Sequence, residues 1–307
     1  MIEVRHLTKQ YENHVAVNDV SFTVKAGETF ALLGPNGSGK TTLLKCLVGL
    51  AAPTQGEICV NQFDIRKAGR AARQSVSYLP QRVAFPESLT AREVLSFYSR
   101  LRRVESGRVE ELLATPQFHF NGFSNRPVGQ YSGGMVQRLG LAVACLPDAP
   151  VMILDEPTVS LDPEGTVLFR EFLASLKRAG KTLLFSSHVL ADVEQLADRV
   201  GIMVGGRLVA LESISALREG LMQASRMRLD LASSEPQYVE AAFRAGARQV
   251  EREENALLIT SLPEDRLEIL RAIETAGGKV VCFSSQEPSL EDVYLQYIGR
   301  QRTSHGH

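Results

Sequence analysis

A glycine-rich segment constrains the fold of this chain more than any other feature of its sequence. Residues 34–42 read Gly-Pro-Asn-Gly-Ser-Gly-Lys-Thr-Thr, which matches the phosphate-loop pattern G-x-x-x-x-G-K-[ST]. The apolar run at 29–33 suits a buried parallel strand, and residues 42–50 have the pattern of a helix. In this strand–loop–helix order, backbone N–H groups and the positive end of the helix dipole both face bound phosphate. The segment therefore predicts a nucleotide site.

Two side chains of this loop have the chemistry to act on the phosphates themselves. Lys40 can reach the β- and γ-phosphates, and the Thr41 hydroxyl can ligate Mg²⁺. The predicted nucleotide-binding residues of the loop are Gly34, Pro35, Asn36, Gly37, Ser38, Gly39, Lys40, Thr41 and Thr42. A phosphate loop alone leaves kinases, GTPases and many ATPases open as candidate functions.

Composition and charge exclude several classes of protein. The formal net charge of -1 argues against a dedicated nucleic-acid binder, which usually carries a basic excess. The four cysteines are scattered without a C-x-x-C pair, so we expect neither structural zinc nor a disulfide framework. The N-terminus lacks the apolar segment of a signal peptide, and no apolar run approaches the ~20 residues that span a bilayer. We therefore expect a cytoplasmic protein.

Short strands and helices alternate along the first two thirds of the chain. Alternating apolar and polar patches at 2–25 predict antiparallel strands. Helical spacing extends over 86–113, although Gly107 weakens the case for one unbroken helix. Further helices are predicted at 135–146, 165–178 and 190–197, and further strands at 57–60, 76–79, 151–154, 182–186, 200–204 and 208–211. This alternation predicts an α/β fold with a largely parallel sheet.

The composition changes at 213–225, and a second pattern follows. We predict a strand at 227–231, a helix at 236–245, strands at 248–251 and 256–260, a helix at 264–276 and a strand at 279–283. This β-α-β-β-α-β order predicts a small α+β domain of the ferredoxin-like type. We expect a closing helix at 288–298 and a polar, flexible tail at 299–307.

A second set of motifs follows the phosphate loop, and their order resembles that of ABC ATPases. Tyr131-Ser-Gly-Gly-Met135 resembles the signature motif of the family, usually Leu-Ser-Gly-Gly-Gln. Val-Met-Ile-Leu-Asp-Glu-Pro-Thr at 151–158 resembles the Walker B strand with its adjoining glutamate. The other matches are Ser160-Leu-Asp162, similar to the D-loop, Ser186-Ser-His188, similar to the switch histidine, and Tyr78-Leu-Pro-Gln81, similar to the Q-loop.

The resemblance implies the architecture of the chain. It predicts an ABC ATPase domain at 1–215, with a RecA-like P-loop core, an antiparallel β subdomain and a helical subdomain at about 87–148. A small α+β accessory domain would occupy 226–298. The resemblance also implies ATP and Mg²⁺ as cofactors and the hydrolysis of ATP to ADP and phosphate.

Each matched residue acquires an implied role. Glu156 would orient the attacking water or accept its proton, and His188 would contact the γ-phosphate. Tyr11 lies where the family places an aromatic that stacks on adenine. The implied catalytic residues are Lys40, Glu156 and His188, and the implied metal ligands are Thr41, Gln81 and Asp155.

The signature motif implies a dimer. Ser132, Gly133 and Gly134 lie where a helix begins, and one chain cannot easily fold them onto its own phosphate loop. By resemblance, these residues and Asp162 contact the ATP that a second copy holds. We expect a head-to-tail homodimer with two shared sites, and a heterodimer stays open.

The chain has one set of nucleotide motifs, and so it resembles the separate ATPase subunit of a transporter. The segment Glu-Pro-Ser-Leu-Glu-Asp-Val-Tyr-Leu at 287–295 resembles the ABC-2, exporter-type group. Residues 78–87 and 131–142 look most like the ATPase of nitrous-oxide-reductase maturation, which would associate the chain with copper-site assembly. The resemblance implies an integral-membrane permease as partner, which would hold the chain at the inner face of the cell membrane.

Other functions stay open at this point. The chain could serve another ABC-2 exporter, of drugs, polysaccharides or lipids, or it could be a soluble non-transport ATPase or a regulatory binding module. Contact with a permease is expected at a groove within 82–98. Its expected apolar floor is Val83, Phe85 and Leu89, and its expected polar rim is Glu87 and Arg92.

Overall fold

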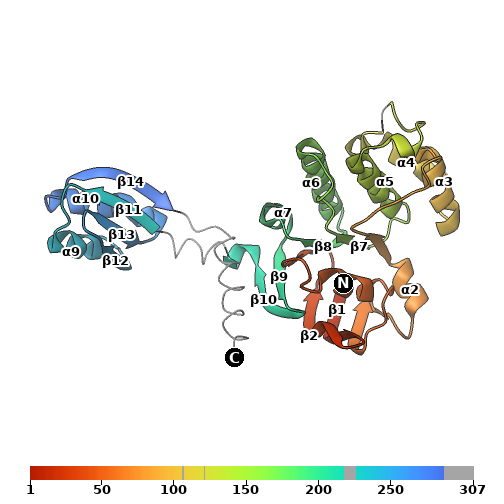
Figure 1. The fold of residues 1–307 in the computed structure, drawn as a ribbon, viewed down its shortest axis with the longest axis horizontal. Coiled ribbons are helices and arrows are strands. Elements are labelled where there is room, and N and C mark those ends of the chain that lie inside the picture. Colours follow the sequence, from red (N-terminus) through yellow and green to blue (C-terminus); the bar gives the residue numbers. More distant parts are fainter. Residues whose placement is uncertain (106, 121, 218–225, 287–307) are drawn as a thin grey trace. The chain divides into compact units, whose positions relative to one another are not determined.

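Two units make up the chain in the computed structural model, residues 1–212 and residues 213–307 (Figure 1). The structure describes residues 1–105, 107–120, 122–217 and 226–286. The helix expected at 288–298 and the tail expected at 299–307 lie outside the described residues. The limits predicted for the ATPase and accessory domains therefore stay predictions.

A six-stranded sheet forms the centre of the first unit. Its strands, in spatial order, are β10 (Arg207–Ser213), β9 (Arg199–Val204), β3 (Thr29–Leu33), β8 (Thr182–Ser187), β7 (Val151–Asp155) and β6 (Val76–Leu79). The five strands from β9 to β6 run parallel. Every residue of β3, β7 and β8 is buried, as expected where both faces of a parallel sheet are covered. The predicted α/β class is thus confirmed.

An antiparallel sheet packs onto this centre through a helix. Its strands are β2 (His14–Val24), β1 (Ile2–Tyr11), β4 (Gln55–Val60) and β5 (Phe63–Asp64), in that spatial order. Helix α1 (Lys40–Leu47) contributes buried residues to the same hydrophobic core as both sheets, for example Leu43, in the cluster that also contains Leu7 of β1 and Leu184 of β8. The helix that carries the end of the phosphate loop is therefore fixed by packing on both sides.

Helices fill the segments between the strands, and they depart from the sequence prediction in two places. The helix predicted over 86–113 is two helices, α3 (Ala91–Arg102) and α4 (Gly107–Ala114). Arg103, with φ of 56°, ends α3 in the left-handed region, so the helix cannot continue there. A short helix that the sequence did not predict, α2 (Gly69–Gln74), precedes β6. The other helices are α5 (Gly133–Cys145), α6 (Pro163–Arg178) and α7 (Leu190–Leu196).

The second unit has the predicted β-α-β-β-α-β order. Its elements are β11 (Arg226–Leu231), α9 (Pro236–Arg244), β12 (Gln249–Arg252), β13 (Ala256–Thr260), α10 (Arg266–Thr275) and β14 (Val280–Gln286). They form an antiparallel sheet of order β12-β13-β11-β14. Leu229, Ile259 and Ile269 are fully buried in its own core. The predicted small α+β fold of this region is confirmed.

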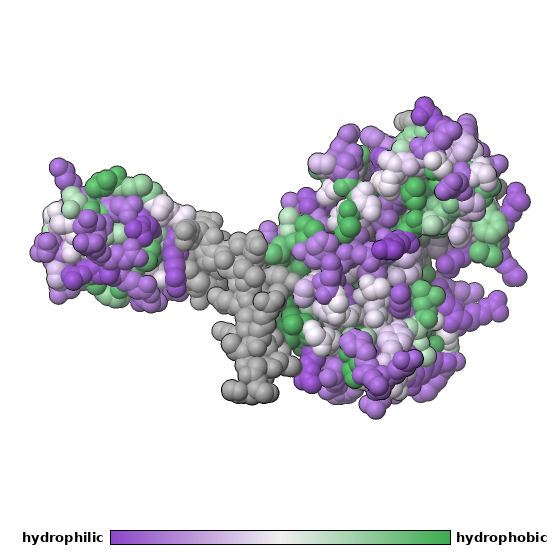
Figure 2. Space-filling view, viewed as in Figure 1, coloured by the Kyte–Doolittle hydropathy of each residue, from purple (hydrophilic) through white to green (hydrophobic). Residues whose placement is uncertain are grey.

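In the described part of the chain, no helix has both the length and the apolar character needed to cross a bilayer. Hydrophobic residues reach the visible face of the molecule as separate patches among hydrophilic ones (Figure 2). Surface patches of limited size are ordinary, so these carry no argument by themselves.

The stability of the first unit should depend on the buried strand β8. Leu184 is fully buried in the core that joins the two sheets. Leu184→Ala should lower the free energy of unfolding by about 2–5 kcal/mol, because it leaves a cavity that the packed strands cannot fill. Leu50→Ala is the matched control, since Leu50 is 67% exposed, and it should change that free energy by less than about 0.5 kcal/mol. Urea denaturation of both variants checks the difference, and equal effects would contradict this description of the core.

Candidate active site

The phosphate-loop segment connects β3 to α1, and glycines shape its backbone. Gly37 and Gly39 have φ of 79° and 99°, in the region that favours glycine. A Cβ on Gly39 would lie 2.3 Å from the carbonyl oxygen of Ala16, so a larger residue does not fit. Gly39 is also the N-cap of α1, and no side chain caps that end. Backbone N–H groups at the start of α1 are therefore available to a bound anion.

Lys40 is buried inside this loop. Its Nζ donates hydrogen bonds to the carbonyl oxygens of Gly34 at 2.7 Å and Pro35 at 3.2 Å. The same Nζ lies 3.4 Å from Oε1 of Glu156. A buried ammonium group is thus paired with a buried carboxylate, the arrangement that makes burial of both charges tolerable.

Asp155 ends β7 and is 1% exposed. Its Oδ1 accepts hydrogen bonds from Ser186 Oγ at 2.6 Å and from Thr41 Oγ1 at 3.2 Å. Its Oδ2 is buried and has no hydrogen-bond partner among the described residues. Burial raises the pKa of this carboxyl above its usual value. An unpaired buried carboxylate oxygen close to a threonine hydroxyl is a donor set that fits Mg²⁺, which prefers oxygen ligands.

Glu156 follows directly and is 5% exposed. Its φ of 46° is rare for a residue other than glycine, and its N–H donates to Ser186 Oγ at 2.9 Å. Oε2 accepts a hydrogen bond from Gln81 Nε2 at 3.2 Å and lies 3.1 Å from Nδ1 of His188. The side chains of three other predicted site residues, Lys40, Gln81 and His188, therefore meet at this one carboxylate.

An open pocket of about 410 Å³ lies over the loop. Its lining consists of Tyr11, His14, Ala16, Asn36, Gly37, Ser38, Gly39, Lys40, Thr41, Thr42, Gln81 and Glu156. Tyr11 is 45% exposed, and Lys9 Nζ lies 4.5 Å from the centre of its ring. A glycine-rich floor with one exposed aromatic ring has the size and chemistry to receive a nucleotide.

Eight predicted site residues do not line this pocket. Four of them contact residues that do: Gly34 and Pro35 accept hydrogen bonds from Lys40, Asp155 accepts one from Thr41, and His188 contacts Glu156.

The other four lie at the ends of two helices. Ser132 caps α5, where its Oγ accepts a hydrogen bond from the N–H of Met135, and Gly133 and Gly134 form the first turn. Asp162 caps α6 and accepts a hydrogen bond from the N–H of Gly165 at 2.9 Å. In the described part of the chain, the residues that line the phosphate-loop pocket include neither cap. A single chain therefore does not bring the signature segment onto its own phosphate loop.

Sequence reasoning missed one residue that the site depends on. Ser186 was recognised only as part of the motif before His188, yet its hydroxyl contacts both Asp155 and Glu156. Asp155 and Ser186 are paired in the register of two adjacent parallel strands. That pairing was the available signal, because the carboxyl ends of neighbouring parallel strands lie at one edge of a sheet.

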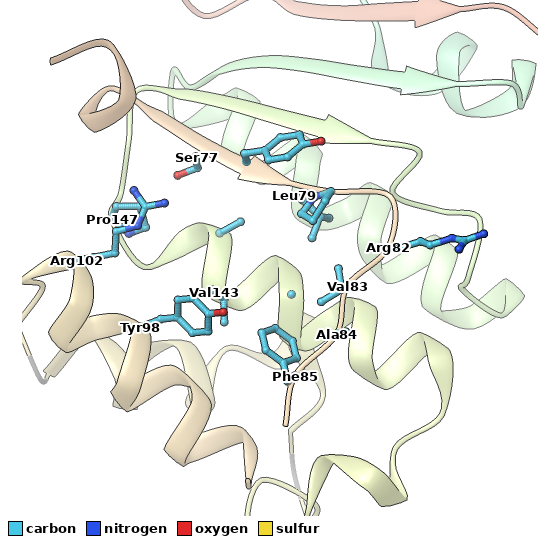
Figure 3. Close-up of a pocket in the computed structure, with 14 residues that line it drawn as sticks. Ser77, Leu79, Arg82, Val83, Ala84, Phe85, Tyr98, Arg102, Val143 and Pro147 are labelled. Carbon is cyan, nitrogen blue, oxygen red and sulfur yellow. The ribbon is translucent and has the colours of Figure 1, made fainter. Parts of the chain in front are cut away.

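A second pocket, of about 250 Å³, lies between the segment after β6 and helices α3 and α5. Figure 3 shows Val83, Phe85, Tyr98 and Val143 around this space, while Arg82 extends away from it. The rings of Phe85 and Tyr98 pack edge to face, with centroids 6.0 Å apart. The space is the predicted groove, which we call the α3–α5 groove.

The prediction of its lining was partly wrong. Val83 and Phe85 line the α3–α5 groove, but Leu89, Glu87 and Arg92 are absent from the described residues that form it. Arg92 instead pairs with Glu110 of α4. Residues of two helices take their place, namely Tyr98, Arg102, Gly140, Val143 and Ala144. The helix break at Arg103 separates α3 from α4, and the sequence prediction of one helix did not anticipate that arrangement.

Comparison with known proteins identifies relatives over nearly the whole chain. Residues 17–159 match the family model described as ABC transporter, and residues 213–298 match the C-terminal domain of ATP-binding protein DrrA1-3-like. The chain is 34% identical over 303 residues to the Nod factor export ATP-binding protein I of Burkholderia orbicola, covering 98% of this chain and 97% of that protein. The corresponding protein of Rhizobium leguminosarum is also 34% identical over 303 residues, with 98% and 95% covered.

Solved structures agree with the family match. A structure of the ATP-binding subunit of an ABC transporter is similar with a TM-score of 0.66 and 29% identity, covering 72% of this chain and 92% of that chain. A dimeric bacterial ABC transporter cassette is similar with a TM-score of 0.63 and 25% identity, covering 70% and 99%. The chain therefore belongs to the ATP-binding subunits of ABC transporters, in the exporter-type group with a DrrA-like C-terminal domain, and is an ATPase.

Proposed function

We propose that this ATPase drives a separate membrane permease and that Glu156 is the residue that activates water. The observation that carries the proposal is the position of the Glu156 carboxylate. It is buried at the pocket over the phosphate loop, 3.4 Å from Lys40 and 3.1 Å from His188. A carboxylate at that place can accept a proton from water that attacks the terminal phosphate.

The other side chains of the site support this chemistry by position and charge. When ATP enters, the Lys40 ammonium group exchanges its loop carbonyl partners for phosphate oxygens and offsets their negative charge. His188, exposed at the mouth of the site, orients the water beside Glu156. Gln81 donates a hydrogen bond to Glu156, which connects the segment after β6 to the site. Tyr11 offers its exposed ring to the adenine.

Mg²⁺ fits the residues at the end of β7. Asp155 and Thr41 would hold it, with Gln81 as the third predicted ligand, and the unpaired Oδ2 of Asp155 is the strongest reason for this placement. When bound, the cation neutralises charge that develops on the phosphate oxygens.

A second copy completes the site in this proposal. Ser132, Gly133, Gly134 and Asp162 lie at helix ends outside the pocket of their own chain. In a head-to-tail dimer with C₂ symmetry, these ends would meet the ATP of the other copy. The similar bacterial cassette described as dimeric supports the arrangement, and partner identity stays open between a homodimer and a heterodimer.

The permease would dock at the α3–α5 groove. This groove is apolar where Val83, Phe85 and Val143 line it, and Arg102 gives it a basic end. A short amphipathic helix of a membrane protein has the complementary chemistry. Gln81 joins the groove to the carboxylate of Glu156, so closure of an ATP dimer would displace the docked helix. This contact would place the ATPase at the inner face of the membrane.

An export substrate is favoured over copper-site assembly. The relatives described above are named for Nod factor export, which supports an exporter without defining this chain's cargo. Neither of these two relatives is named for nitrous-oxide-reductase maturation. The copper role remains a prediction from sequence likeness, and co-purification of the permease with its cargo would decide between the two.

Substitutions should separate hydrolysis from nucleotide binding. Glu156→Gln should keep ATP affinity, lower kcat by about 10² or more, and accumulate an ATP-bound dimer, because only proton acceptance is lost. Lys40→Ala should weaken ATP binding itself, since it removes charge from the phosphates. Equilibrium ATP binding, turnover and size-exclusion chromatography measure the three effects. Turnover at the wild-type rate in Glu156→Gln would refute the assigned role.

Mg²⁺ should act through Asp155 before any hydrolysis occurs. In the wild type, adding Mg²⁺ should tighten ATP binding. In Asp155→Asn, the factor by which Mg²⁺ tightens ATP binding should be about tenfold smaller, or ~1.4 kcal/mol less binding free energy. The reason is the loss of a charged oxygen ligand at the position of the unpaired Oδ2. Calorimetric ATP titrations with and without Mg²⁺ give the comparison. Glu156→Gln serves as control, and its ATP binding should depend on Mg²⁺ as fully as that of the wild type. If ATP binding by Asp155→Asn kept the same Mg²⁺ dependence, Asp155 would not be a ligand of the metal.

Permease docking should depend on the aromatic wall of the α3–α5 groove. Phe85→Ala should cost about 2 kcal/mol of binding free energy to the permease, as aromatic anchors of an interface do. ATP binding by the isolated chain should stay unchanged, since Phe85 does not line the phosphate-loop pocket. Phe63→Ala is the matched control, because Phe63 is a partly exposed phenylalanine of β5 in the antiparallel sheet. Pull-down of the permease from detergent-solubilised membranes tests this, and wild-type recovery by Phe85→Ala would exclude the groove.

A further inference from the structure

A partly buried hydrogen bond lies two residues beyond Glu156. The hydroxyl of Thr158 donates to Oδ2 of Asp192 at 2.6 Å. Asp192 is 2% exposed and lies in the first turn of α7, just after His188 in the chain. Thr158 and Asp192 belong to neither the loop nor the pocket lining described above. The bond therefore joins the segment after Glu156 to the segment after His188, outside the pocket.

Arg170 fixes the other oxygen of the same carboxylate. Its Nε and one terminal nitrogen donate to Asp192 Oδ1 at 2.9 Å and 2.5 Å. Arg170 belongs to α6, the helix that Asp162 caps. Charge-assisted bonds of this kind are strong and geometrically specific. They hold Asp192 in one rotamer and leave its Oδ2 directed at Thr158.

Beyond the bond between Ser186 Oγ and the N–H of Glu156, the two segments of the site are joined at two further points. One is the contact between Glu156 Oε2 and His188 Nδ1, and the other is the bond between Thr158 and Asp192. The Asp192 N–H donates to the carbonyl oxygen of Val189, the residue after His188, so the carboxylate is anchored close to the histidine. Two bonds between the same short segments restrict their relative rotation, which one bond would not do.

Glu156 needs such support because of its backbone. Its φ of 46° is sparsely populated for a residue with a side chain, and such residues persist only where neighbours over-determine them. Ser186 Oγ holds the N–H of Glu156, and Gln137 Nε2 of α5 donates to the carbonyl oxygen of buried Pro157 at 3.4 Å. The Thr158 hydroxyl is the next contact along the chain. The turn is thus fixed at three successive residues.

We propose that Asp192 is a positioning residue for hydrolysis, acting on Glu156 through the Thr158 hydroxyl. The proposal rests on the function assigned to Glu156 above. Asp192 does not touch the nucleotide pocket, so ATP affinity does not depend on it. What depends on it is the direction of the Glu156 carboxylate relative to His188. Small misplacements of a reacting group reduce turnover without weakening substrate binding.

The test compares two conservative changes at position 158. Thr158→Val removes the hydroxyl and keeps the shape, so kcat should fall roughly tenfold to a hundredfold, with ATP affinity near that of the wild type. Tm should fall somewhat, because buried Asp192 loses a hydrogen bond. Thr158→Ser keeps the hydroxyl and loses only the methyl group, so it should retain most of the turnover. Equal turnover in both variants, or a loss of ATP affinity in Thr158→Val, would overturn the proposal.

A second arm separates positioning from a general structural role. In the Glu156→Gln background, adding Thr158→Val should cause no further loss of single-turnover rate, because the bond acts only through that carboxylate. Additive losses would overturn the proposal and leave Glu156 in its role. A wild-type rate for Glu156→Gln alone would instead refute the proposed function and, with it, this inference. Asp192→Asn provides an independent variant and should reproduce the loss of kcat at unchanged ATP affinity.

Discussion

One serine hydroxyl joins the carboxylate of Asp155 to the backbone of Glu156, the two acidic residues of the candidate site. Ser186 Oγ donates to Asp155 at 2.6 Å and accepts from the N–H of Glu156 at 2.9 Å. This is possible because β7 and β8 are neighbours whose register pairs Asp155 with Ser186. With β3 on the other side of β8, the phosphate loop begins at the same sheet edge. Strand order alone therefore assembles the loop, the metal-binding carboxylate of our proposal and the glutamate.

The residues outside this assembly have a use within their own chain. Ser132 and Asp162 each satisfy an N–H group at the start of a helix, α5 and α6 respectively. Their caps stabilise those helix ends whether or not a nucleotide is near. In the proposed dimer the same ends, with their remaining N–H groups and positive dipoles, meet the second copy's ATP. At each helix start, the capped N–H group would thus stabilise the fold, and the remaining N–H groups would contact the ATP.

The sequence predicted the parts of the structure that depend on short-range pattern. The buried strands, the loop and the order of the second unit follow from apolar runs and glycines, and they were confirmed. Helix α2 was missed because it is short and polar, with Ala72 as its single buried residue. Gly107 was read as a weak point within a helix, whereas α4 begins there and the break lies at Arg103.

The site was predictable to a similar depth. The resemblance to ABC ATPases predicted Asp155, Glu156 and His188 as site residues, but not the contacts that these residues make. The pairing of Thr158 with Asp192 spans 34 residues and depends on how α7 packs, which no local pattern encodes.

At Glu156, the strained backbone lowers stability, whereas the carboxylate of the same residue belongs to the candidate site. Glycine or asparagine would occupy φ of 46° with less strain than glutamate does. Neither could supply a carboxylate to the phosphate pocket. Either replacement would also leave the buried Lys40 ammonium group without its carboxylate partner, and the hydrogen bonds around Glu156 offset part of the backbone strain. A stability screen of this protein would therefore record two opposing effects at this position, relief of strain and loss of an ion pair.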